Sequence, residues 1–154
     1  MSKAFTRDDD GNEQADLLPE LAVSPYPNLV TSLGLAGIEA EIVRLKKIHA
    51  KAMESGDDAA AAIAARDLHY WFSRRDTAQL VENSTGPQVM FGSRVTLARD
   101  DGITATYRIV GTDEADPKQG TLSYVAPLAQ ALMGKTVGDT VTVAAHEFTI
   151  VTFA

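Results

Sequence analysis

The stretch that decides the fold of this 154-residue chain is Thr104-Ala105-Thr106-Tyr107-Arg108-Ile109, together with the residues just before it. Residues 94–98 and 104–109 both alternate between apolar and polar side chains, which is the period of a half-buried β-strand. Asp100-Asp101-Gly102 lies between them and is a typical hairpin turn sequence. These residues therefore predict two antiparallel strands joined by a tight turn.

The residues that follow complete a small domain over residues 90–154. Residues 121–125 predict another strand, and residues 139–143 and 147–153 predict two more. Pro127 suits the first position of a short helix that ends near Met133-Gly134. The pattern predicts a twisted antiparallel β-sheet with one short helix across it, which is the arrangement of FKBP-like domains.

The residues before this domain have the period of α-helices. Apolar side chains recur with spacings of three and four on a first helix, and Ser55-Gly56-Asp57-Asp58 then breaks the run. An alanine-rich second helix follows and is expected to end near Glu82. We predict an antiparallel helical hairpin, a short coiled coil, over residues 30–82. Residues 83–89 are a linker by composition, and residues 1–29 are an acidic tail expected to be flexible. The predicted fold class is α+β.

Composition excludes several functions. The formal net charge of −7 argues against broad binding of nucleic acid through its phosphates. The absence of cysteine excludes disulfides and thiolate chemistry. No apolar stretch is long enough to cross a membrane, and the N-terminus has no secretory pattern. We therefore expect a cytoplasmic protein without a membrane partner, and a monomer because one hairpin buries its own apolar stripe.

Five segments, taken in order, carry a family resemblance. They resemble the C-terminal domain of the GreA/GreB transcription elongation factors, and the hairpin before them resembles the coiled-coil arm of that family. The segments are Phe91-Gly92-Ser93-Arg94-Val95, residues 106–111, Asp113-Glu114-Ala115-Asp116, residues 123–135 and Val137-Gly138-Asp139-Thr140-Val141.

The resemblance implies a function without catalysis by the chain itself. Gre-type factors bind RNA polymerase through the C-terminal domain and insert the coiled coil into the secondary channel. There, carboxylates at the tip help to hold the second catalytic Mg²⁺, and the polymerase cleaves backtracked RNA. The resemblance thus implies Asp57 and Asp58 as tip residues near a Mg²⁺ shared with the polymerase, with no cofactor bound by the free chain. The docking candidates are Asp113, Glu114, Asp116, Ser123, Pro127 and Leu128.

Two features depart from the family pattern. The family has a Glu three residues after the tip Asp, where this chain has Ala60, although Asp58 adds a neighbouring acid. The arm is also short, because only 25 positions separate Thr31 from Gly56, roughly a heptad less than the family pattern. At 1.5 Å per residue, a lost heptad withdraws the tip by about 10 Å.

Other interpretations remain open at this stage. Asp57 and Asp58 also suit a helix N-cap and a first-turn acid, without any metal. A regulator of the Rnk group, with a Gre-like C-terminal domain and a short hairpin, would occupy the channel without stimulating cleavage. A peptidyl-prolyl isomerase would need an aromatic-lined pocket, for which residues 90–154 offer only five aromatic side chains and no tryptophan. An adaptor for a partner other than polymerase is the last alternative.

Overall fold

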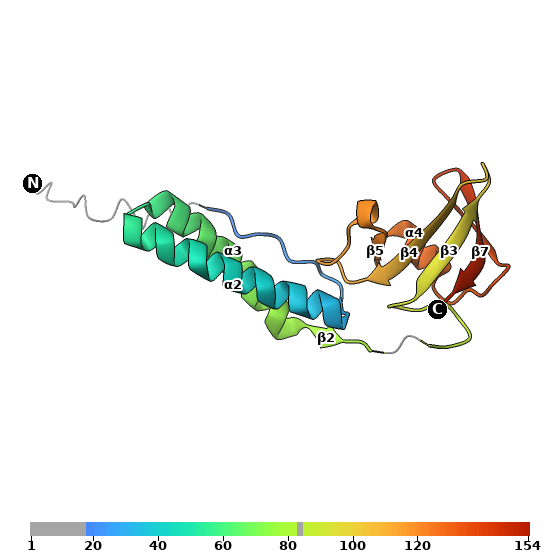
Figure 1. Cartoon of the computed structure of the whole chain (residues 1–154), viewed down its shortest axis with the longest axis horizontal. Coiled ribbons are helices and arrows are strands. Elements are labelled where there is room, and N and C mark those ends of the chain that lie inside the picture. Colours follow the sequence, from blue (N-terminus) through green and yellow to red (C-terminus); the bar gives the residue numbers. More distant parts are fainter. Residues whose placement is uncertain (1–17, 83–84) are drawn as a thin grey trace, which may run out of the picture. The chain divides into compact units, whose positions relative to one another are not determined.

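The computed structural model describes residues 18–82 and 85–154. These residues form two compact units, which we describe separately. The first contains the described residues up to Val23 together with residues 38–77, and the second contains residues 24–37 together with residues 78–154. Two long helices precede a curled β-sheet with one short helix, so the predicted α+β class is confirmed (Figure 1).

The first unit is built on the helices α2 (Ser32–Ser55) and α3 (Asp58–Thr77), joined by a two-residue turn. Lys46 of α2 lies over the Phe72 ring of α3, 5.6 Å from its centroid. Ile48 follows Leu45 of α2 at a spacing of three but is 41% exposed. The apolar side chains buried along these helices are Ile38, Ile42, Leu45, Ala52, Ala61, Ala64 and Leu68. Their three-and-four spacing is that of the predicted coiled-coil hairpin.

Helix α3 ends at Thr77, five residues before the predicted end near Glu82. The reason is a short parallel pair of strands, β1 (Leu29–Val30) and β2 (Gln79–Leu80), which the sequence pattern missed. The Gln79 amide donates to the Asn28 carbonyl at 2.8 Å, and the Val81 amide donates to the Val30 carbonyl at 2.9 Å. Residues 24–29, predicted as part of a flexible tail, therefore belong to the second unit. Residues 1–17 of that tail lie outside the described residues.

The second unit is dominated by a five-stranded sheet in the order β5-β4-β3-β7-β6. Its strands are β3 (Arg94–Arg99), β4 (Thr104–Val110), β5 (Thr121–Ser123), β6 (Thr140–Val143) and β7 (His146–Phe153). The predicted hairpin at residues 100–102 is confirmed, with Gly102 at a φ of 87°. One pairing departs from the antiparallel sheet predicted, because β5 runs parallel to β4. The ten residues between them, including the 3₁₀-helix η2 (Pro117–Gln119), give the chain room to cross over.

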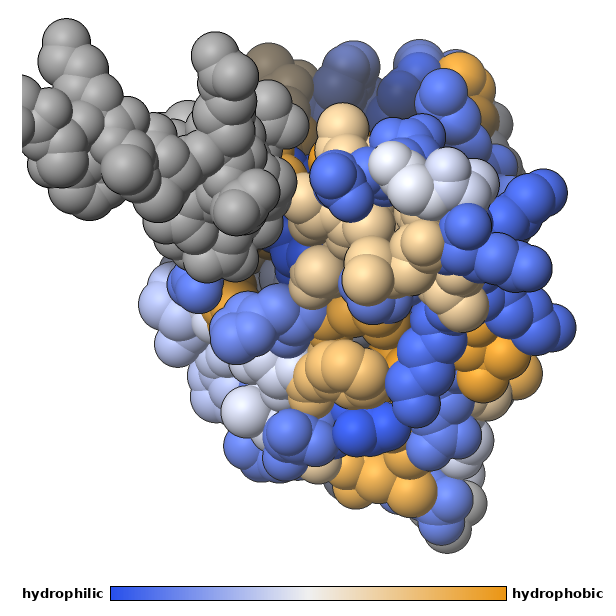
Figure 2. All heavy atoms as spheres, turned by 90° about the vertical axis from the view of Figure 1, so that its left-hand side faces the viewer, coloured by the Kyte–Doolittle hydropathy of each residue, from blue (hydrophilic) through white to orange (hydrophobic). Residues whose placement is uncertain are grey.

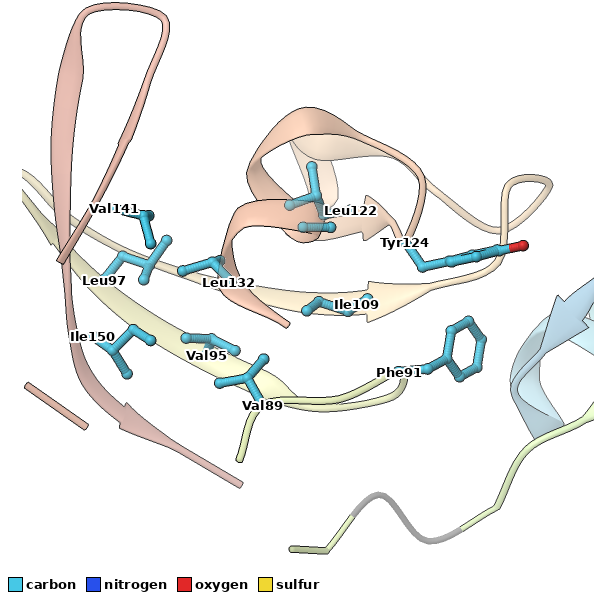
Figure 3. Close-up of a cluster of buried hydrophobic side chains, with 11 residues drawn as sticks. Val89, Phe91, Val95, Leu97, Ile109, Leu122, Tyr124, Leu132, Val141 and Ile150 are labelled. Atoms are coloured by element: carbon cyan, nitrogen blue, oxygen red, sulfur yellow. The ribbon is translucent and has the colours of Figure 1, made fainter. Parts of the chain in front are cut away.

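The core of this unit lies between the sheet and the short helix α4 (Pro127–Leu132). Val95 and Leu97 point from β3 toward Leu132, and Ile150 joins them from β7 (Figure 3). These four side chains are at most 1% exposed. The rings of Phe91 and Tyr124 meet edge to face at 5.7 Å between centroids, at the end of the core nearest the N-terminus of α4.

None of the helices in the described residues is long and apolar enough to cross a membrane.

The turn between β6 and β7 is strained. Ala144 and Ala145 both adopt the left-handed region, at φ of 52° and 66°, where a Cβ atom is unfavourable. We predict that Ala145→Gly stabilises the protein by about 0.5–1 kcal/mol, because glycine relieves the strain but loses more chain entropy on folding. Urea unfolding measures the change. Ala50→Gly, in the exposed middle of α2, is the control and should destabilise by about 1 kcal/mol. An equal loss in both variants would contradict the assigned turn.

The β3–β4 turn leads to a second prediction, which concerns the titration of Asp101. Arg99 pairs with Asp101 and lowers the pKa of its carboxyl from 3.8 to about 2. A lowered pKa stabilises the fold above the unfolded pKa, and this contribution is lost as the pH falls through the folded value. Carboxyl carbon chemical shifts should therefore show Asp101 titrating near pH 2, and Arg99→Gln should move the midpoint toward 3.8. An unchanged midpoint in Arg99→Gln would show that the ion pair is not the cause.

Candidate functional site

The turn between α2 and α3 carries the predicted tip residues. Gly56 has a φ of 72°, and its amide donates to the Met53 carbonyl. The Asp57 amide donates to the Ala52 carbonyl at 2.9 Å, which completes a Schellman motif at the end of α2. Asp57 also begins the next helix, because its Oδ1 accepts the Ala60 amide at 3.1 Å. The helix-cap interpretation of Asp57 is therefore correct as a description of its contacts.

The same turn presents acidic groups to solvent. Glu54, Asp57 and Asp58 are all exposed, and Met53 is 60% exposed beside them. Figure 2 views the molecule from the left-hand side of Figure 1 and shows many hydrophilic residues, with weakly hydrophobic ones at the centre and a few strongly hydrophobic ones among them. Among the described residues no three His, Asp or Glu side chains come together as a metal site. The turn can thus lend one or two carboxylates to a Mg²⁺ held mainly by another molecule, but it is not a complete cage.

The segment around α4 carries three of the predicted docking residues. Ser123 ends β5, and its hydroxyl accepts the Val125 amide at 3.3 Å. Pro127 is the first residue of α4 and is exposed, while Leu128 is half-buried against the core. The inward face of α4 consists of Ala129 and Leu132, both 0% exposed. Pro127 is thus held on the surface by a helix whose other face is fixed in the core.

The turn after β4 carries the other three predicted docking residues, Asp113, Glu114 and Asp116, and all three are half-buried. Asp116 caps η2, because its Oδ1 accepts the Lys118 amide at 3.2 Å, and its own amide donates to the Thr121 hydroxyl at 2.7 Å. Asp113 precedes it in the same turn and has a polar contact of its own. Glu114 has the most specific partner of the three. The hydroxyl of Thr31 donates to Glu114 Oε2 at 2.6 Å.

Thr31 is the N-cap of α2. Its Oγ1 accepts the Gly34 amide at 3.0 Å, and its carbonyl accepts the Leu35 amide at 2.9 Å. One hydroxyl thus accepts from the helix and donates to the Glu114 carboxylate. A Cβ on Gly34 would stand only 2.7 Å from Glu114 Oε2, so the glycine makes room for this carboxylate.

Two further contacts attach the segment before α2 to the same unit. The Tyr124 hydroxyl donates to the Pro27 carbonyl. Gly111 lies against β1 so closely that a Cβ would be 2.2 Å from the Leu29 carbonyl oxygen, which is a backbone atom. We call the contacts of Thr31, Gly34, Gly111 and Glu114 the latch. All four residues belong to the second compact unit.

Sequence reasoning missed the latch and one buried cation. Nothing in the sequence links Thr31 to Glu114, which lies 83 positions away. Arg74 of α3 carries a positive charge and is nevertheless only 2% exposed. The available signal was the Thr-x-x-Gly spacing at the start of α2. Glycine destabilises a helix relative to alanine, so a glycine at the third helical position suggests that a side chain there would meet another part of the chain.

The latch predicts opposite effects for two glycines. Gly111→Ala should destabilise the protein by about 1–3 kcal/mol, because the new methyl group meets a backbone oxygen that cannot rotate away. Gly37→Ala should stabilise it by up to about 1 kcal/mol, since nothing lies within 4 Å of its Cβ position in helix α2. Thermal unfolding of the two variants checks both signs. Equal stability of Gly111→Ala and wild type would contradict the close approach.

The structure therefore defines a helical hairpin with an acidic turn, together with a curled-sheet domain that carries an exposed proline on a short helix. The family model "Transcription elongation factor, GreA/GreB, C-term" matches residues 84–153. Transcription elongation factor GreA of Desulfovibrio desulfuricans is 38% identical over 130 residues, covering 71% of this chain and 80% of that protein. GreA of Alkalilimnicola ehrlichii is 37% identical over 139 residues, covering 75% of this chain and 87% of that protein.

The chain belongs to the GreA/GreB family of transcription elongation factors. Among solved structures, GreA factor homolog 1 (Gfh1) of Thermus thermophilus aligns with a TM-score of 0.41 at 23% identity, covering 82% of this chain and 97% of that one. The named relatives favour the GreA/GreB assignment over the Rnk-like alternative.

Proposed function

We propose that this protein binds bacterial RNA polymerase and places its hairpin turn in the secondary channel, where it modulates elongation and the cleavage of backtracked RNA. It would act in the cytoplasm and would not be an enzyme itself. The observation that carries the proposal is the exposed acidic turn at Asp57 and Asp58, in a chain whose sheet domain matches the GreA/GreB model.

The docking surface in this proposal is the segment from Ser123 to Leu128, together with Asp113 and Asp116 of the turn that precedes β5. Pro127 supports it, because an exposed proline on a rigid helix loses little entropy on binding. The half-buried Leu128 beside it can contribute apolar contact area. Glu114 is left out of this surface, because its carboxylate already accepts a hydrogen bond from the Thr31 hydroxyl.

The tip residues Asp57 and Asp58 could supply one or two ligands to a Mg²⁺ shared with the polymerase. Asp57 Oδ1 accepts the Ala60 amide, so Asp57 would bind a metal ion through Oδ2. Asp58 offers a second exposed carboxylate. Mg²⁺ retains several waters and needs only one or two protein carboxylates. The ion, when held by the polymerase, supplies the Lewis acidity for phosphodiester cleavage. The chain would contribute charge and orientation to it.

A second candidate function is occupation of the channel without stimulation of cleavage. Ala60 favours it, because this position lies three residues after Asp57 and offers no carboxylate to a metal ion. The turn therefore has only Asp57 and Asp58 where the family pattern has a further acid.

Transcript cleavage in a backtracked elongation complex tests the proposal. We expect wild type to act on the native polymerase and Asp57→Ala/Asp58→Ala to lose at least tenfold of any cleavage stimulation, because two ligand carboxylates are removed. Glu147→Ala, on the sheet domain, is the matched control and should behave as wild type. The loss of the Asp57 cap costs about 1 kcal/mol, so thermal unfolding must show that the double variant is folded at the assay temperature.

A competing GreA, added to the same reactions, separates the two candidates. Cleavage by wild type alone supports action at the metal. Silence with inhibition of the competitor supports occupation of the channel. If the protein neither stimulates cleavage nor competes, and does not bind the polymerase in a pull-down, the proposed function is wrong and a different partner must be sought.

A further inference from the structure

We propose that Glu114 is a positioning residue, which acts through the latch to fix the direction of α2 and hence the place of the tip, and not a docking contact. The proposal rests on the proposed function, because it explains how that tip is aimed. It rests on four contacts of the second compact unit and on the continuity of α2 from the latch to Ser55.

The first step is the chemistry of the Thr31 hydroxyl. It accepts the Gly34 amide at 3.0 Å and donates to Glu114 Oε2 at 2.6 Å, so the carboxylate is connected to the first turn of α2 through one atom. A hydrogen bond to a charged carboxylate is stronger than a neutral one. The positive end of the helix dipole adds to it, since a carboxylate at a helix N-terminus is favourable. Thr31 itself is 2% exposed, which limits competition from water.

The second step is the close fit around this bond. Gly34 leaves space for the carboxylate, and Gly111 leaves space for the Leu29 carbonyl, where Cβ atoms would stand 2.7 Å and 2.2 Å away. Two glycines are thus used where the chain segments meet, although glycine in a helix costs about 1 kcal/mol relative to alanine. Gly37, one turn further along α2, has open space and shows what an unconstrained glycine in this helix looks like.

The third step is the length of α2, because a small tilt at one end of a long helix moves the other end by several ångströms. Helix α2 has 24 residues and is therefore about 36 Å long. A tilt of about 10° at its first turn would displace its far end by about 6 Å over that length. A ligand atom must come to about 2.0–2.1 Å from Mg²⁺, so a displacement of this size abolishes any contact of Asp57 with the ion. A change at Glu114 would therefore alter the position of Asp57 in the α2–α3 turn, although Glu114 does not contact that turn.

A distance measurement on the free protein tests the latch. The chain has no cysteine, so spin labels at Ala50→Cys and Thr142→Cys, both exposed positions, would be the only ones. We expect Glu114→Ala to broaden the distance distribution at least twofold, and Glu114→Gln, which keeps an acceptor oxygen for Thr31, to stay close to wild type. Thr31→Val should broaden it and Thr31→Ser should not. Glu147→Ala is the control for the loss of an acid.

A polymerase experiment tests the consequence. Glu114→Ala should keep its Kd for the polymerase within about twofold, while its effect at saturation falls at least tenfold and Glu114→Gln restores it. Weaker binding with an unchanged effect at saturation would make Glu114 a docking contact and overturn the proposal. Unchanged distance distributions in both Glu114→Ala and Thr31→Val would overturn it as well. If the distributions broaden but no variant binds polymerase, the latch stands and the proposed function is the part that fails.

Discussion

The hydroxyl group of Thr31 is the point on which the rest of the structure depends. It closes the first turn of α2 by accepting the Gly34 amide, and it binds the turn after β4 by donating to Glu114. Without this hydroxyl, the Gly34 amide in the first turn of the 24-residue helix would lose its hydrogen-bond acceptor. The parallel pair β1–β2 and the Tyr124–Pro27 bond extend the same attachment to the residues before the helix.

The sequence predicted those features that depend on neighbouring residues. The alternation of residues 94–98 and 104–109, with Asp100-Asp101-Gly102 between them, defines a local hairpin, and the structure confirms it. Gly56 and Asp57 satisfy the helix ends on either side of them within a few residues, so the position of the hairpin turn was also predictable. Local hydrogen bonding and side-chain period are enough for such elements.

What the sequence did not predict depends on residues far apart in the chain. Strands β1 and β2 have two residues each, too few for any period, and exist because residues 28–30 and 79–81 meet. The parallel direction of β5 follows from the crossover that precedes it, not from the alternation of its three residues. The contact of Thr31 with Glu114 spans 83 positions, and for this reason Glu114 was assigned only a surface role.

In the proposed function, the acidic hairpin turn reaches into the polymerase while the sheet domain remains docked on its outside. Hydroxyl-radical mapping tests it most directly, with an iron chelate attached to Ser55→Cys, at the end of α2, in a chain that has no other cysteine. We expect cleavage of polymerase segments that line the secondary channel, and we expect a competing GreA to remove these cuts. Cuts confined to the outer surface of the polymerase, or none at all in a complex shown to form, would contradict it.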